Sequence, residues 1–296
     1  MDNVTTESST AAKSSTPENP DNANVRVEDP DETCYVMKTS PKGLFVLINQ
    51  RDFSENTDFY KKPRMGTDED AKALEKLFTE IGFQVERYDN KNAEEVRKIF
   101  KDVQKNVKDG RKYPNVSCFA CAILTHGEDG GVIWCTDKEI PLKVLADDIS
   151  HANHLVGKPK FFIVQACRGG EAMDPIDYNE ADASDPNETL TLPLHADFLF
   201  AYSTAPGFAS FRHPEYGSWF VQVLVDVFRQ QAHKLDAVKM LTRVNYRIAA
   251  RKAKLRKPDE PETKEIKCQI PSITSQLRKD FYLMPSMQLS LRKTNH

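Results

Sequence analysis

The sequence has no apolar run long enough to cross a membrane, and its first residues lack the basic and apolar segments of a secretory signal. It also lacks an excess of charge of one sign, because 41 Lys and Arg stand against 44 Asp and Glu, a formal net charge of −3. This balance argues against a protein that binds nucleic acid through bulk positive charge. We therefore expect a cytoplasmic protein that has neither a membrane nor a nucleic acid as a partner.

Cysteines are few and scattered along the chain. The six are Cys34, Cys118, Cys121, Cys135, Cys167 and Cys268. The one close pair, Cys118 and Cys121, falls in a strand-like segment, so its side chains should point to opposite faces. No second pair is available for a structural zinc site. We expect reduced thiols, as in the cytoplasm, and neither a metal nor a cofactor.

The chain divides into a polar leader and a region with regular patterns. Residues 1–33 are rich in Ser, Thr, Asn, Asp and Pro and contain almost no large apolar residue. Such a segment cannot bury enough surface to offset its ordering entropy, so we predict that it is disordered.

After the leader, short apolar segments alternate with amphipathic segments of helical period. The predicted strands are 43–49, 83–88, 116–125, 161–166, 197–202 and 275–284, and the predicted helices are 67–81, 93–107, 143–156, 218–231 and 235–252. Residues 132–142 look like a hairpin, whereas 203–217 and the charged stretch 252–267 are expected to be loops. Alternating strands and helices predict an α/β fold with a mostly parallel sheet.

Two of the buried strands end in reactive residues. His126 follows the run FACAILT, and Cys167 follows FFIVQA. The carboxyl ends of parallel strands lie at one edge of a sheet, so an imidazole there could act as the base for the thiol. The N–H groups of Gly127 and Cys167 could then form an oxyanion hole. Taken singly, a cysteine at a strand end is usually structural and a His-Gly pair is usually a turn, but their joint placement favours catalysis.

Eight motifs extend this pattern along the chain. They are Arg64-x-Gly66-Thr67-Asp68, Thr125-His126-Gly127-Glu128, Gly157-Lys158-Pro159-Lys160, Gln165-Ala166-Cys167-Arg168-Gly169, Ala196-Asp197-Phe198-Leu199, Tyr202-Ser203-Thr204-Ala205-Pro206-Gly207, Gly217-Ser218-Trp219-Phe220 and Gln269-Ile270-Pro271-Ser272. With them the chain resembles a caspase from about residue 41 to residue 285, and most of all an executioner caspase with a short leader.

The resemblance implies a fold and a reaction. The fold would be a three-layer α/β/α sandwich around a mostly parallel six-stranded sheet, with the last strand, near residues 276–283, at the edge. The activity would be that of a cysteine endopeptidase that hydrolyses peptide bonds after aspartate. Cys167 would be the nucleophile, His126 the general acid and base, and the carbonyl of Lys62 would replace a third catalytic side chain.

The resemblance also implies that Arg64, Gln165 and Arg212 line the pocket for the aspartate before the cut bond. Two guanidinium groups suit a carboxylate, although either arginine alone would more often be a solvated loop residue. Tight walls should disfavour glutamate, which is one methylene longer.

Ser210, Phe211, His213 and Trp219 would bind residues further upstream in the substrate. Ala209 stands where executioner caspases usually carry an aromatic residue. Together with the basic stretch after Arg251, this suggests a roomier second pocket and a preference for acidic upstream residues.

An acidic segment, residues 171–190, interrupts the alternation of strands and helices. Long internal loops of this kind are usually functional. In caspase precursors a comparable segment is cut after Asp, and here Asp182 is the first choice and Asp177 the second, with Asp21 and Asp31 as weaker candidates. The resemblance thus divides the chain into a propeptide (1–33), a large catalytic subunit (34–182) and a small subunit (183–296).

The expected partners are protein substrates, an upstream activating caspase, inhibitor proteins and a second copy of the cleaved unit, all acting in apoptosis. Two alternatives are open. A non-enzymatic regulator of caspases is disfavoured because His126, Cys167, Arg64 and Arg212 are all intact. A paracaspase- or metacaspase-like enzyme that cuts after Arg or Lys would need acidic residues in place of the two arginines.

Overall fold

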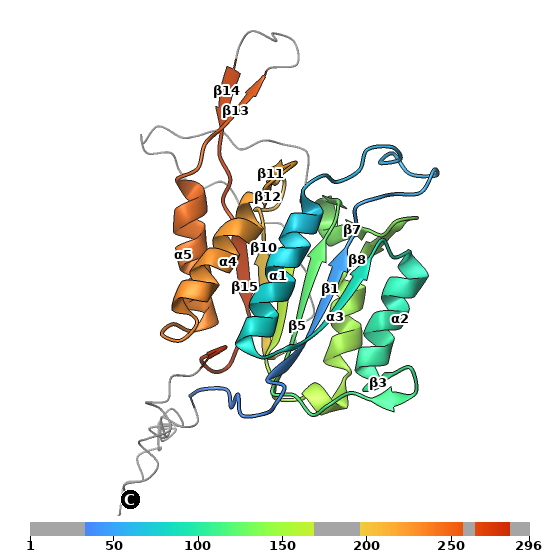
Figure 1. The fold of residues 1–296 in the computed structure, drawn as a ribbon, viewed down its shortest axis with the longest axis vertical. Helices are drawn as coiled ribbons and strands as arrows, with labels where there is room; N and C mark the ends of the chain where they lie inside the picture. The colour runs from blue at the N-terminus through green and yellow to red at the C-terminus, as the bar shows by residue number, and fades with distance from the viewer. Residues whose placement is uncertain (1–32, 169–195, 257–263, 285–296) are drawn as a thin grey trace, which may run out of the picture.

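One six-stranded sheet forms the centre of the protein. The computed structural model describes residues 33–168, 196–256 and 264–284. The strand order is β15-β10-β9-β5-β1-β2, and every neighbouring pair is parallel except β10 and β15 (Figure 1). The strands are β1 (Gly43–Asn49), β2 (Gln84–Asp89), β5 (Cys118–Leu124), β9 (Lys160–Gln165), β10 (Phe198–Tyr202) and β15 (Ser272–Ser275). The predicted mostly parallel six-stranded sheet is confirmed.

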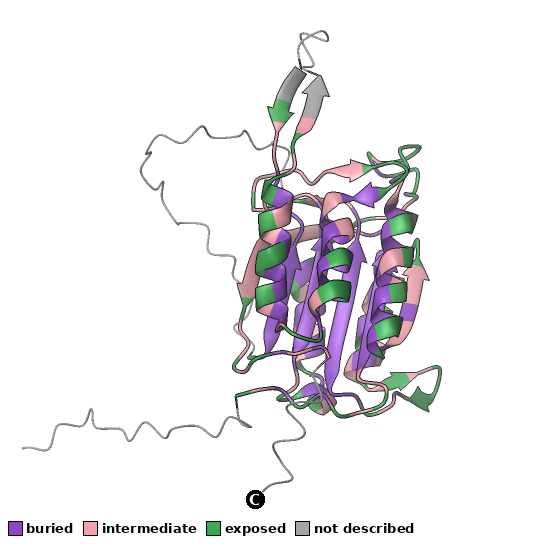
Figure 2. Ribbon diagram, turned by 60° about the vertical axis from the view of Figure 1, so that its left-hand side comes forward, coloured by how far each residue is buried: buried purple, intermediate pink, exposed green. Residues whose placement is uncertain are grey.

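Helices cover both faces of this sheet. All residues of β1, β5, β9 and β10 are buried, as expected for strands between two helical layers (Figure 2). On one face lie α1 (Thr67–Ile81), α4 (Trp219–Gln231) and α5 (Ala237–Ala249), and on the other lie α2 (Ala93–Gln104) and α3 (Leu142–Ser150). Apolar residues at helical spacing, such as Leu74 and Phe78 of α1, face the strands. The predicted three-layer sandwich is confirmed.

Short elements decorate the sheet. They are β3 (Val107–Lys108), β4 (Arg111–Lys112), β6 (Gly127–Glu128), β7 (Val132–Trp134), β8 (Glu139–Pro141), β11 (Arg212–His213), β12 (Gly217–Ser218), β13 (Ala253–Arg256), β14 (Lys264–Lys267) and the 3₁₀ turns Asp129–Gly131 and Asn153–Leu155. In Figure 1, β7, β11 and β12 lie at the end of the molecule to which the arrows of β1 and β5 point.

Three predicted helices, 93–107, 143–156 and 235–252, are too long, because α2 ends at Gln104, α3 at Ser150 and α5 at Ala249.

The bounds of the last predicted strand are also wrong. The last strand is Ser272–Ser275 rather than 275–284, because the pairing with β10 runs from Tyr202↔Ser272 to Leu199↔Ser275 and β10 begins only one residue before Leu199. Phe281 and Leu283, whose alternation suggested a strand, are buried in irregular chain. The position of this strand at the sheet edge is confirmed.

The charged stretch 252–267 is not only a loop, because β13 and β14 pair in it as an antiparallel hairpin. A hairpin needs complementary backbone groups rather than apolar residues, so charge alone is a poor guide to its absence. Likewise the predicted loop 203–217 contains β11, which pairs with β12.

Asp197 joins segments that are far apart in the sequence. Its backbone has a left-handed φ of 76°, and its side chain accepts hydrogen bonds from the hydroxyl of Tyr35 (2.7 Å) and from Nε and Nη2 of Arg278 (both 2.8 Å). Lys160 lies 3.8 Å away. Burial alone would raise the pKa of Asp197, but the bonds from Arg278 and Tyr35 and the charge of Lys160 lower it.

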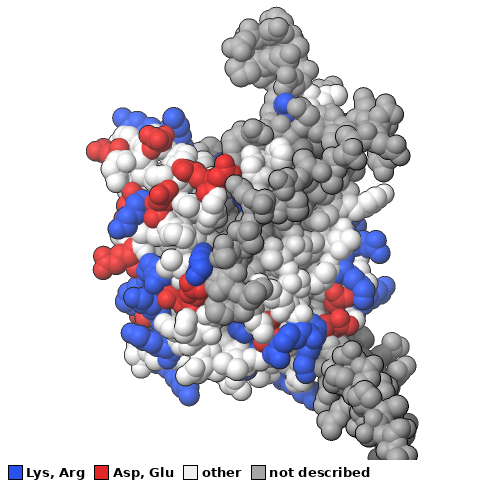
Figure 3. All heavy atoms as spheres, turned by 180° about the vertical axis from the view of Figure 1, so that it is seen from behind, with Lys and Arg blue, Asp and Glu red and all other residues white. Residues whose placement is uncertain are grey.

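The surface carries charges of both signs. Figure 3 shows basic and acidic side chains interspersed over one face of the described residues. No helix among the described residues is long and apolar enough to span a bilayer. The predicted disordered leader lies almost wholly outside the described residues, as do Asp21, Asp31, Asp177 and Asp182.

Candidate active site

The register of two parallel strands brings the predicted catalytic residues together. Leu124 at the end of β5 is paired with Gln165 at the end of β9, and the N–H of Thr125 donates to the carbonyl of Gln165 (3.1 Å). His126 and Cys167 each follow two residues after this pair. They therefore leave the same edge of the sheet at matching positions, as expected from the sequence.

Gly127 lies directly against the main chain of Cys167. A Cβ atom at Gly127 would stand 2.4 Å from the carbonyl oxygen of Cys167 and 2.9 Å from Cβ of Ala166. Contacts of this length are not tolerated, so only glycine allows this approach. The structure thus brings together the two residues predicted to supply oxyanion-hole N–H groups.

Aromatic rings surround His126. Phe59 stacks on the imidazole with centroids 3.9 Å apart and an interplanar angle of 9°, and Phe53 lies 5.1 Å away. Nε2 of His126 is buried, and no residue in the described part of the chain forms a hydrogen bond with it. The predicted carbonyl of Lys62 therefore does not hold this nitrogen, and ring packing orients the imidazole instead.

The environment keeps His126 neutral. Burial lowers the pKa of His126 to about 3, and the positive charges of Arg64 and Arg212 act in the same direction. At neutral pH the imidazole is thus unprotonated and can accept a proton, as a general base must.

Arg64 is almost completely buried, with 1% of its surface exposed. Its Nη1 donates to the carbonyl of Gln50 (2.8 Å) and to Oγ1 of Thr67 (2.9 Å), and that hydroxyl donates to Oδ1 of Asn49 (2.7 Å). Nε and Nη2 of Arg64 are buried and have no hydrogen-bond partner among the described residues. This free edge is the one that guanidinium groups present side-on to a carboxylate.

Arg212, on β11, lies close to Arg64 in space. Its Nε donates to the carbonyl of Met65 (2.9 Å), the residue after Arg64. Burial and then the charge of Arg212 lower the pKa of Arg64. The two cations therefore lie close enough to repel each other, although 148 positions separate them in the sequence.

Gln165 belongs to the same site through a chain of hydrogen bonds. Its Nε2 donates to Oγ of Ser210 (2.8 Å), while its Oε1 is buried and none of the described residues donates to it. Gln269 supports Ser210 from behind: its Nε2 donates to Oγ of Ser210 (3.3 Å) and to the carbonyl of Ser203 (2.6 Å). Its Oε1 accepts from the N–H of Phe211 (2.8 Å).

The residues predicted for the outer pockets, Ser210, Phe211, His213 and Trp219, lie in one strip of the chain, residues 210–219. The rings of Phe211 and Trp219 are 5.1 Å apart, and the N–H of Trp219 donates to the carbonyl of Phe211 (3.2 Å). The guanidinium of Arg251 lies 5.9 Å from the ring of Trp219. His213 is exposed and stacks on Tyr216 at 4.7 Å.

Three residues of the site were not predicted from the sequence. Phe59 could have been noticed as an aromatic residue in an otherwise polar loop. Asp70 looked like a helix-start acid, and Gln269 appeared in a motif without a role. Their functions depend on contacts between distant segments, which a local pattern does not encode.

Comparison with known proteins identifies the family. A family model described as Caspase domain matches residues 42–282. The chain belongs to the caspase family. Caspases are cysteine-type endopeptidases, so the predicted enzyme class is confirmed. The chain is 37% identical over 255 residues to Caspase-7 of Gallus gallus, a match that covers 84% of this chain and 79% of that protein.

Further relatives give the same answer. Caspase-3 of Mesocricetus auratus is 37% identical over 253 residues, covering 85% of this chain and 87% of that protein. The crystal structure of Caspase-1 from Spodoptera frugiperda matches with a TM-score of 0.72 and 28% identity, covering 91% of this chain and 97% of that one. The predicted resemblance to executioner caspases is thus confirmed.

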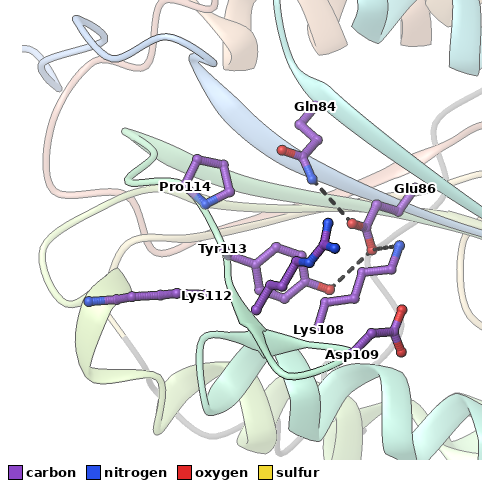
Figure 4. A pocket seen from close by; sticks show the side chains of 8 residues that line it. Gln84, Glu86, Lys108, Asp109, Lys112, Tyr113 and Pro114 are labelled. Atoms are coloured by element: carbon purple, nitrogen blue, oxygen red, sulfur yellow. Dashed lines mark hydrogen bonds and ion pairs between the residues drawn. The ribbon is translucent and has the colours of Figure 1, made fainter.

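A cavity of about 580 Å³ lies elsewhere in this caspase, at the β2 edge of the sheet (Figure 4). Its floor is the buried carboxylate of Glu86. Oε2 of Glu86 accepts from the hydroxyls of Tyr88 (2.7 Å) and Tyr113 (3.1 Å) and lies 3.0 Å from Nζ of Lys108, while Oε1 accepts from Gln84 (3.2 Å). Because both oxygens are satisfied, this network serves the fold rather than a ligand.

Proposed function

We propose that this caspase cuts protein substrates after aspartate, with Cys167 as nucleophile and His126 as general acid and base. The observation that carries the proposal is the free, buried Nε and Nη2 edge of Arg64, beside the charge of Arg212. A buried cationic edge without a partner is costly, and a substrate carboxylate would satisfy it. An asparagine side chain would leave the charge uncompensated.

Gln165 would complete this pocket. Turning its amide by half a turn would exchange Oε1 and Nε2, so that the hydroxyl of Ser210 donates to the oxygen and the NH₂ group points to the substrate carboxylate. Ser210 can serve both arrangements because a hydroxyl donates as well as accepts.

The reaction would follow from these positions. His126 accepts the proton of the Cys167 thiol, and the sulfur attacks the carbonyl carbon of the aspartate before the scissile bond. The N–H groups of Gly127 and Cys167 stabilise the resulting oxyanion. His126 then returns the proton to the leaving amine as the C–N bond breaks. In the second half, water loses a proton to His126, attacks the thioester, and releases the new carboxyl group and the thiol.

We also propose that the chain is made as a precursor. Cys167 and Arg212 lie on either side of residues 169–195, so one cut between them separates the nucleophile from part of the pocket. Cleavage after Asp182, with Asp177 as second choice, would let an upstream caspase mature the enzyme; Asp21 and Asp31 are weaker sites. The family membership supports three further parts of the proposal. Cleavage would divide the chain into 34–182 and 183–296, the enzyme would act in the cytoplasm during apoptosis, and inhibitor proteins would control it.

A second copy of the cleaved unit is the proposed partner at the sheet edge. Within residues 33–168, 196–256 and 264–284, β15 pairs with β10 and with no other strand, so its other edge presents backbone groups that a second β15 could satisfy. The proposed outer pockets are formed by Ser210, Phe211, His213 and Trp219. Arg251 lies beside Trp219, Lys252 follows it in the sequence, and these positive charges would favour acidic upstream residues in the substrate.

The test is turnover of matched fluorogenic peptides that end in Asp, Glu or Asn before the reporter group. The processed wild type should cleave the Asp peptide, with at least a hundredfold lower kcat/KM on the other two, and Cys167→Ser should be inactive. Absence of turnover on the Asp peptide by correctly processed protein would contradict the proposal and favour a non-enzymatic regulator.

A further inference from the structure

Asp70 is a buried carboxylate that the proposed reaction does not use. It lies in the first turn of α1, six residues after Arg64, and is 1% exposed. Both of its oxygens accept from the N–H of Ser218, at 2.8 and 3.0 Å. Ser218 is the β-pairing partner of Arg212 in the β11–β12 hairpin. Asp70 therefore connects α1, the helix that follows Arg64, to the β11–β12 hairpin that carries Arg212.

Two glycines make this close approach fit. A Cβ atom at Gly217 would stand 2.3 Å from Oδ1 of Asp70, and one at Gly66 would stand 2.2 Å from the carbonyl oxygen of His213. Both glycines also have left-handed φ angles, 84° and 83°. The two segments are thus packed backbone to backbone, with room for a carboxylate of the length of aspartate.

The charge of Asp70 acts on both arginines. It opposes the lowering of the pKa of Arg64 and that of Arg212, which burial causes in each case. In turn, burial raises the pKa of Asp70 to about 7, while the bonds from Ser218 and the two arginines pull it down. Asp70 thus acts electrostatically on both cations in addition to accepting the hydrogen bonds from Ser218.

We propose that Asp70 is a positioning residue of the aspartate pocket, whose charge holds Arg64 and Arg212 side by side while the pocket is empty. The substrate carboxylate then adds the second negative charge to two positive ones. Without Asp70, the repulsion between the guanidinium groups moves Arg212, the less buried of the two, toward water. Each substrate that binds must then return Arg212 to its position beside Arg64. This inference rests on the proposed cleavage after aspartate.

The test separates charge from hydrogen bonding. Asp70→Asn keeps the size of the side chain and one acceptor for Ser218 but removes the charge. In the processed enzyme, we expect KM for an Asp-ending fluorogenic peptide to rise at least tenfold and kcat to stay within threefold. Glu69→Gln is the matched control, because it makes the same charge change at the neighbouring, exposed position and should alter neither constant.

A readout without turnover keeps this inference separate from the proposed reaction. In the Cys167→Ser protein, a product peptide ending in Asp should bind at least tenfold more weakly after Asp70→Asn, as measured by calorimetry. If Asp70→Asn does not fold, Asp70→Ser takes its place, since serine is smaller and retains an acceptor. A folded variant whose KM and peptide affinity stay within twofold of the parent would overturn the inference and leave Asp70 a structural acceptor.

Discussion

The ring of Phe59 lies parallel to the imidazole of His126, 3.9 Å above it. This contact replaces the hydrogen bond that commonly orients a catalytic histidine, because Nε2 of His126 has no partner in the part of the chain that the structure describes. It also excludes water from one face of the imidazole. Phe59 thus accounts for both the orientation and part of the burial of the base.

Phe59→Ala should therefore weaken catalysis without unfolding the protein. A stacked aromatic pair is worth about 0.5–1.5 kcal/mol, so we expect kcat/KM to fall by up to about tenfold. Water would reach the imidazole, and the pKa of His126 would rise toward its ordinary value, which moves the acid limb of the kcat/KM profile to higher pH. Tyr60→Ala, at the exposed neighbouring ring, is the control, and Phe59→Tyr should restore both parameters. An unchanged pH profile in Phe59→Ala would contradict the role given to Phe59.

His126 should make the stability of the protein depend on pH. Its pKa is about 3 in the folded state and near 6.5 in the unfolded state, so between these values only the unfolded chain binds the proton. The contribution is fully present above pH 6.5 and is lost as the pH falls, by about 2 kcal/mol between pH 7 and pH 5. Urea unfolding of the Cys167→Ser protein, with and without His126→Gln, measures it at both pH values. The two proteins should differ in how much stability they lose, and equal losses would show that His126 is not the group responsible.

Gly127→Ala should strongly reduce activity while leaving the fold intact. The new methyl group would clash with the main chain of Cys167 at 2.4 Å, which pushes the two N–H donors apart. Loss of one oxyanion donor typically lowers kcat about 10²–10³-fold, and we expect a loss of that size. Gly130→Ala provides the comparison, because its φ of 76° makes the substitution cost about 1–2 kcal/mol of stability but no atom lies within 4 Å. Its kcat should be normal.

Glu86→Ala should destabilise the protein without affecting catalysis. Removing the carboxylate leaves the hydroxyls of Tyr88 and Tyr113 and the ammonium of Lys108 without their acceptor, at a cost of about 2–3 kcal/mol. Chemical denaturation measures this loss, and kcat of the folded fraction should not change. Glu75→Ala, which removes a half-exposed partner of Arg87, should cost less than about 1 kcal/mol. A stability loss no larger than that of Glu75→Ala would argue against the Glu86 network.

The sequence predicts the layers of this fold well. The central strands are buried on both faces, so each is a continuous apolar run, such as FACAILT, that can be recognised from the local sequence alone. It predicts the ends of β5 and β9 for the same reason, and so the exit of His126 and Cys167 from the same edge of the sheet. It fails at β15 and at the β13–β14 hairpin, where backbone pairing rather than side-chain burial determines the strand.

The supporting residues of the site were missed for a different reason. Phe59, Asp70 and Gln269 act on partners 67, 148 and 66 positions away, namely His126, Ser218 and Ser203. Such contacts follow from the assembled fold and have no period or spacing in the chain.

The parallel pairing of β9 with β10 bears on the cleaved enzyme. A cut after Asp182 would leave β9 on one piece and β10 on the other, while Asp197 on the second piece remains bonded to Tyr35 of the first. The uncut chain folds in a unimolecular reaction, but the cut pieces must meet, so their refolding becomes second order. Dilution would slow the recovery of the mature protein after denaturation and leave that of the precursor unchanged.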